Sequence, residues 1–237
     1  MSRAIALLLP LLAMAPPAMA GSRAVYEGMP GPPIVIEVGD NGDARIGADG
    51  KDEFGLLIGS EFYLVAKDGA QWKVARIADQ AAAFDKVLPP IFRTLFSAAG
   101  KAAPSKLKMV KKGTRSVAGI TGDVYAVTGL DSEKPAEVTE LVITTDPRLV
   151  PVGRALGGFN DAMMVMMAPL IGEMAASEVA DNHALMALGT PLDTRNGLHL
   201  TAFAEARIDP ARLALPARPQ TVDQIVAGIK VTPTDGK

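Results

Sequence analysis

The stretch that decides the fold is residues 34–77, IVIEVGDNGDARIGADGKDEFGLLIGSEFYLVAKDGAQWKVARI. Short runs rich in apolar and β-branched residues alternate here with Asn-Gly and Asp-Gly dipeptides. Glycine at these dipeptides tolerates the positive φ that tight hairpin turns need. The stretch therefore predicts an antiparallel meander, with strands at Ile34–Val38, Asp43–Gly47, Phe54–Ile58, Glu61–Ala66 and Gln71–Ile77.

A helical period follows the meander. Phe84, Leu88, Ile91 and Leu95 form one apolar stripe after Asp79, a candidate N-cap, and Pro89-Pro90 should interrupt the helix. Strands return between Lys106 and Thr145, where Lys106, Lys108, Lys111 and Lys112 are typical of a solvated edge strand. A contact of these lysines with anionic lipid or an acidic partner is the alternative.

In the last third of the chain a helix is again followed by a strand, and a short helix comes after it. Gly157–Ala187 is helical by pattern, and Pro169 should kink it or start a new helix. Leu198–Ile208 alternates as a half-buried strand with all its even-numbered residues on one face, and Thr221-x-x-Gln224 predicts a capping box. Strand runs with inserted helices indicate an α+β fold with an antiparallel sheet. We expect one domain over residues 21–237, with residues 21–33, rich in Gly and Pro, as an irregular entry segment.

The first twenty residues predict export. Arg3 precedes the apolar run Ala4–Leu12, and Ala18-Met19-Ala20 is a small-x-small cleavage site, so cleavage is expected after Ala20. Pro10, Pro16 and Pro17 argue against a membrane-spanning helix in this segment. The sequence thus predicts a periplasmic protein. Without any Cys it has neither a lipidated N-terminal cysteine nor a disulfide, and no stable membrane anchor is expected once the signal is removed.

Composition narrows the classes of function. The 24 basic and 26 acidic residues give a net charge of −2, which provides no electrostatic footprint for nucleic acid. Aromatic residues make up only 5 %, which argues against a carbohydrate site built on stacked rings. The absence of Cys excludes thiol nucleophiles and thiolate metal sites. No cofactor is expected.

Four segments together resemble an exported bacterial family of unknown function, the DUF4412-type proteins. They are Gly113–Val127, Glu140–Pro147, Gly189–Leu192 and Leu213–Ala217. The resemblance implies a fold similar to the periplasmic lipoprotein carriers of the LolA/LolB type. That fold is a curved antiparallel sheet, an incomplete barrel, with helices packed on its concave face. The family offers no established catalytic residues to carry over.

The methionine-rich helix is the main candidate binding site. Adaptable thioether side chains suit a deformable apolar pocket, and we expect five residues on one helix face to line it: Met163, Met166, Met167, Leu170 and Met174. The alternative is a plain core helix. A Cu(I) site at Met163-x-x-Met166 lacks supporting His residues, so no metal site is predicted.

Three hypotheses about function follow. The first is non-catalytic binding of an apolar ligand, either a lipid or an acylated polypeptide. The second is an envelope structural or interaction protein, with a protein partner and no small ligand. The third is a hydrolase that depends on His183 or His199, which lacks the Gly-x-Ser-x-Gly motif of a serine nucleophile. The sequence favours the first and predicts no catalytic residue.

Overall fold

The computed structural model describes residues 21–28, 31–89, 91, 107–130, 134–194 and 197–229. The predicted signal segment, its cleavage site at Ala20 and the position of Leu95 lie outside these ranges.

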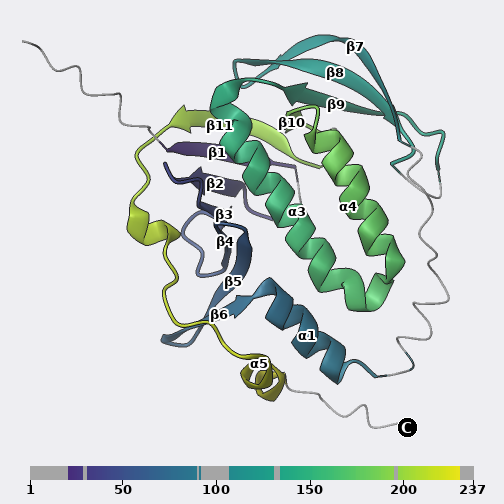
Figure 1. Cartoon of the computed structure of the whole chain (residues 1–237). Helices are drawn as coiled ribbons and strands as arrows, with labels where there is room; N and C mark the ends of the chain where they lie inside the picture. The colour runs from purple at the N-terminus through teal and green to yellow at the C-terminus, as the bar shows by residue number, and fades with distance from the viewer. Residues whose placement is uncertain are drawn as a thin grey trace, which may run out of the picture.

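One antiparallel sheet of eleven strands forms the body of the fold (Figure 1). The sheet is curved and does not close, with β6 at one edge and β7 at the other, so the predicted α+β fold with an incomplete barrel is confirmed. The order across the sheet is β6-β5-β4-β3-β2-β1-β11-β10-β9-β8-β7. The strands are β1 Ser22–Glu27, β2 Ile34–Val38, β3 Ala44–Ala48, β4 Phe54–Ile58, β5 Glu61–Asp68, β6 Gln71–Arg76, β7 Lys108–Val117, β8 Ile120–Thr128, β9 Thr139–Thr144, β10 Thr190–Asp193 and β11 His199–Glu205.

The predicted meander is confirmed as β2 to β6, each strand pairing antiparallel with the next. The turns lie where the sequence places them. Gly42 has φ +85° and Gly69 φ +61°, conformations that a side chain disfavours. Local turn chemistry therefore sets the register of this half of the sheet.

The prediction of an irregular entry segment over residues 21–33 is wrong for its first half. Ser22–Glu27 is β1, which lies between β2 and β11 near the middle of the sheet. Its residues alternate, with Ser22, Ala24 and Tyr26 buried and Arg23 and Val25 less so. The Gly and Pro residues that suggested a loop cluster only after Glu27. These residues led to the prediction of a loop for the whole segment, so the strand before them was missed.

A second correction concerns β11. The pairing of β1 with β11 shifts register between Val25 and Tyr26, because Val25 is opposite Ala202 while Tyr26 is opposite Leu200. The irregularity changes which residues face the core. Leu200 is fully buried and Phe203 also packs against the main core, whereas Ala202 and Ala204 are exposed. The even-numbered residues of this strand therefore do not share one face.

Four helices accompany the sheet among the described residues: α1 Ile77–Val87, α3 Val150–Ile171, α4 Glu173–Met186 and α5 Val222–Gly228. Helix α1 ends at Val87, and Leu88 is extended before Pro89, as the proline pair predicts. Its N-cap is Arg76 rather than Asp79, because β6 runs directly into the helix and both carboxylate oxygens of Asp79 accept from Arg76 at 3.1 Å. The capping box of Thr221 and Gln224 on α5 is confirmed.

The long helical segment begins earlier and breaks later than predicted. Asp146 caps the 3₁₀ turn Pro147–Leu149, which leads into α3 at Val150. Pro169 stays inside α3, and the break comes at Gly172, where φ is +56°. Only this left-handed residue separates α3 from α4, so the two helices fold back on each other as a hairpin (Figure 1).

The two faces of the sheet are covered by different parts of the chain. Helix α3 lies across the concave face and contacts β1 to β5 and β10. The largest fully buried side chains of this core include Tyr26, Leu149, Leu192 and Leu200. On the other face, Leu215 and Ala217 of the C-terminal tail pack against Leu56, Val65 and Val74. This segment thus crosses the convex face of the sheet before α5 begins.

Candidate ligand-binding cavity

The five residues predicted to line a pocket do not act as one face. Met163 and Met166 pack against the main core, and Met167 and Leu170 are half-buried on α3. Met174 is 41 % exposed and lies on α4, beyond the break at Gly172. None of the five lines either of the two cavities described next, which lie beside these helices. The predicted single face is wrong because the helix ends before it reaches Met174.

An apolar cavity of about 470 Å³ lies between the helical hairpin and the β9–β11 part of the sheet. Its size falls within the range of about 300–1,000 Å³ usual for small-molecule sites. The lining residues come from the loop after β8, from β9, α3 and α4, and from β10 with the loop and residues that lead to β11. They are Leu130, Thr139, Leu141, Ile143, Leu156, Phe159, Asn160, Asn182, Leu185, Met186, Pro191, Thr194, Gly197 and Leu198.

Alternation along β9 provides one wall. Thr139, Leu141 and Ile143 point to the same side of the strand, toward α4. Leu185 of α4 packs against the same cluster as Leu141 and Ile143. The cavity therefore lies next to the packed contact between β9 and α4.

Helix α3 provides the opposite wall. Leu156 is 5 % exposed and Phe159 follows it by three residues, so both side chains lie on one face of the helix. The Phe159 ring also meets Phe62 of β5, with the ring centroids 5.8 Å apart. This contact fixes the helix against the meander and holds the wall in position.

The polar groups of the lining are few and unevenly satisfied. Thr194 Oγ1 accepts from the backbone N–H of Leu198 at 2.7 Å. Asn182 Nδ2, in contrast, is buried and has no hydrogen-bond partner among the residues that the structure describes. No charged side chain is found among the described lining residues. The arrangement suits an apolar ligand with little charge.

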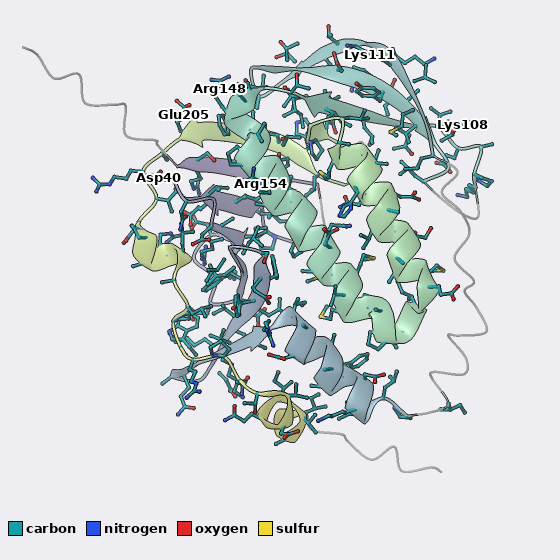
Figure 2. The ribbon with its side chains drawn as sticks, in the orientation of Figure 1. Asp40, Lys108, Lys111, Arg148, Arg154 and Glu205 are labelled. Carbon is teal, nitrogen blue, oxygen red and sulfur yellow. The ribbon has the colours of Figure 1, made fainter. Side chains whose placement is uncertain are left out.

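A second cavity, of about 500 Å³, lies beside the same hairpin and is more polar. It is lined in part by Ser60 of the β4–β5 turn, by Arg154 and Asp161 of α3, and by His183 of α4. Figure 2 shows Arg154 on the first half of α3. Asp161 Oδ2 lies 2.8 Å from His183 Nε2, which ties the two helices together.

The two histidines of the hydrolase hypothesis do not share a site. His183 pairs with Asp161, whereas His199 of β11 lies 3.6 Å from Asp193. Neither contact includes a serine hydroxyl. Within the described ranges, no group of three or more His, Asp or Glu side chains could hold a metal ion.

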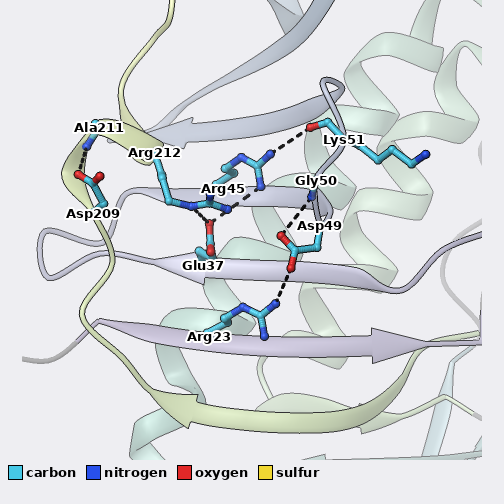
Figure 3. A network of polar contacts seen from close by, with 9 residues as sticks. All are labelled: Arg23, Glu37, Arg45, Asp49, Gly50, Lys51, Asp209, Ala211 and Arg212. Carbon is cyan, nitrogen blue, oxygen red and sulfur yellow. Dashed lines mark hydrogen bonds and ion pairs between the residues drawn. The ribbon is translucent and has the colours of Figure 1, made fainter.

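Among the described residues, the most buried charges lie on the tail-covered face of the sheet (Figure 3). Glu37 of β2 and Arg45 of β3 are 6 % and 7 % exposed. Glu37 Oε2 accepts from Arg212 Nε at 2.9 Å and lies 4.0 Å from Arg45. Burial, with a smaller contribution from Arg212, lowers the pKa of Arg45, while the hydrogen bond to Glu37 raises the pKa of Arg212. Each charge has a partner, so this cluster joins the tail to the sheet.

Comparisons with known proteins return no match: no protein-family model fits the chain, and neither the curated proteins nor the solved structures contain a significant relative. The resemblance to the DUF4412-type family and to the lipoprotein carriers therefore stays a prediction. None of the helices in the described ranges combines the length and the hydropathy that a membrane crossing needs.

Sequence reasoning missed the cavity because its walls come from five separate parts of the chain. One signal was present: Asn160 and Asn182 are amide side chains within stretches that are helical by pattern. Their spacing of 22 residues places them at the same level only once α4 folds back on α3.

Proposed function

We propose that this protein is an exported, non-catalytic binding protein for an apolar ligand, either a lipid or the acyl chain of an acylated polypeptide. The observation that supports this function is the cavity of about 470 Å³, whose described lining is apolar and carries no charged side chain. Burying apolar surface there contributes favourably at about 25 cal/mol per Å² before the costs of association.

The test begins with the protein purified from its native envelope. Mass spectrometry of an organic extract identifies any retained lipid, and a pyrene-labelled acyl ester measures binding to the delipidated protein. Retained lipid and saturable probe binding are expected. Neither retained lipid nor probe uptake would contradict the proposed function.

A cavity-filling variant connects binding to this site. Leu185→Trp adds volume inside the cavity and should abolish probe binding. Val165→Trp is the matched control, because Val165 is 43 % exposed on α3 and does not line the cavity. Loss of probe binding in both variants, or in neither, would place the probe elsewhere.

Export is part of the proposal and rests on residues 1–20. Cell fractionation should recover the protein in the periplasm, and N-terminal sequencing should begin at Gly21. An uncleaved N-terminus or a cytoplasmic protein would contradict it.

A second candidate function, an envelope interaction protein, is favoured by the edge strand β7. Val110 of β7 is 52 % exposed, and Figure 2 shows Lys108 and Lys111 along the same strand. Lys111 pairs with Asp123 at 2.7 Å. Such an edge can pair with a strand from a partner. Periplasmic crosslinking from a residue introduced at Val110 should then capture one protein above background, in the absence of any bound lipid.

A further inference from the structure

We propose that the cavity selects an uncharged amphiphile, with an ester or amide carbonyl beside its acyl chain, and that the Asn182 side-chain amide donates a hydrogen bond to that carbonyl. The inference rests on the proposed function, because it specifies the ligand class of the same site. It excludes free fatty acids as the preferred ligand.

The first argument comes from charge. The described lining contains no Lys, Arg or His side chain that could pair with an anion. Transfer of a carboxylate or phosphate from water to an apolar site without a partner is strongly unfavourable. A ligand whose polar group enters this cavity is therefore neutral.

The second argument comes from Asn182. Its Nδ2 atom is buried and lacks a hydrogen-bond partner among the described residues, although the side chain lines the cavity. An unpaired buried donor costs free energy, and such groups often mark a site of function. The terminal torsion of Asn is broad and roughly two-fold, so rotation of the amide can turn its donor toward the cavity. A carbonyl oxygen is the acceptor that would satisfy it.

The surroundings of Asn182 disfavour an anion further. Asp181 is its neighbour in sequence, and Glu178 lies one turn earlier on the same helix. Burial, with the nearby Asp181 carboxylate adding to it, raises the pKa of Glu178. Asp161 and Asp181 each keep one buried carboxylate oxygen without a partner among the described residues. Asp161, Glu178 and Asp181 thus place three acidic groups on this hairpin, and His183 is already paired with Asp161.

The experiment compares three competitors of equal chain length at pH 7: a fatty acid methyl ester, the free fatty acid and the hydrocarbon. Each displaces the pyrene-labelled acyl ester from the delipidated full-length protein. We expect the ester to bind at least about tenfold more tightly than the ionised acid, because the acid must lose its hydration without gaining a partner. Equal affinities, or tighter binding of the acid, would overturn the inference.

Two variants assign the selectivity to Asn182. Asn182→Leu should weaken ester binding by about 3- to 10-fold, the value of one hydrogen bond, and leave hydrocarbon binding unchanged. Asn182→Asp keeps the shape of the side chain but replaces the donor with an acceptor, and it should weaken ester binding at least as much. Unchanged ester affinity in both variants contradicts the role of Asn182. If no competitor and no probe binds the wild-type protein, the proposed function itself fails, which is a different result.

Discussion

The two faces of the sheet differ in how completely their buried charged and amide side chains are paired, although the buried hydroxyls of Tyr26 and Thr190 on the helix-covered face do have partners. On the tail-covered face, Glu37, Arg45 and Arg212 satisfy one another. On the helix-covered face, Asn182 Nδ2 and one oxygen each of Asp161 and Asp181 are buried without a partner among the described residues. Of these groups, Asn182 lines the cavity.

This difference between paired and unpaired buried groups indicates which region stabilises the fold and which region binds a ligand. Buried polar groups in folded proteins are nearly always paired, so a cluster of unpaired ones calls for an explanation. Proteins tend to break such rules at sites where function requires it. We therefore interpret the Glu37 cluster as structural and the hairpin beside the cavity as the binding region, and the predictions below test that division.

The largest change in the free energy of unfolding is expected on substitution of Glu37. Glu37→Ala leaves the buried Arg45 with no carboxylate within ion-pair distance among the described residues. Removing one partner of a buried ion pair costs about 3–5 kcal/mol. Urea unfolding should show this decrease in the free energy of unfolding, with binding of the acyl probe unchanged in the folded protein.

A double variant provides the control. Replacing both charges, Glu37→Leu with Arg45→Met, leaves neither charge of this pair buried and should recover most of the lost stability. If the single and double variants are equally unstable, the cost comes from altered packing and not from the unpaired charge.

At Asn182, substitution is expected to raise the free energy of unfolding and not to lower it. Asn182→Leu removes a buried donor that has no partner among the described residues, so the free energy of unfolding should rise by about 1 kcal/mol. The same variant loses ester selectivity, which makes it more stable and less functional. Lower stability in this variant would show that Asn182 is satisfied in solution, and the contrast between the two faces would then disappear.

A smaller effect is expected where the helix faces the second cavity. Gly157 lies inside α3, and a Cβ added there would meet only Met186 Cγ at 3.7 Å, an ordinary contact. Gly157→Ala should therefore stabilise the helix by about 0.5–1 kcal/mol. Gly153→Ala is the matched control one turn earlier, because its Cβ would collide with the Thr190 hydroxyl and should destabilise the protein. Thermal unfolding of the pair checks both signs, and destabilisation by Gly157→Ala would show that the second cavity has no free space at this position.

The sequence predicted correctly those elements that are marked by residues close to them in the chain. Three of the four hairpins of β2 to β6 follow from Asn41-Gly42, Asp49-Gly50 and Asp68-Gly69, since a turn and its flanking strands lie within a few residues. Strand β1 was missed because its partner β11 lies far away in the chain and the Gly and Pro residues after Glu27 suggested a loop.

The candidate site could not be predicted in the same way. A methionine pattern shows that a helix is apolar, but it does not show which side faces a cavity. Met163 and Met166 turned out to pack into the core, whereas Asn182 and Leu185 line the cavity. Their placement depends on Gly172, which ends α3 and directs α4 back along it.

The smallest effect is a pH dependence at Glu178. Burial, followed by the neighbouring Asp181 carboxylate, raises the pKa of Glu178 above its ordinary value of 4.5. The folded protein then holds this proton more tightly than the unfolded chain, so the group's contribution to stability falls as pH rises from about 4.5 through the folded-state pKa. Glu178→Gln lacks this titration, and its stability should match the wild type at pH 4 and exceed it slightly at pH 7. Urea unfolding at the two pH values measures the difference in free energy of unfolding between the variant and the wild type. A difference that stays constant or shrinks as pH rises would mean that burying the Glu178 charge on this hairpin costs no stability.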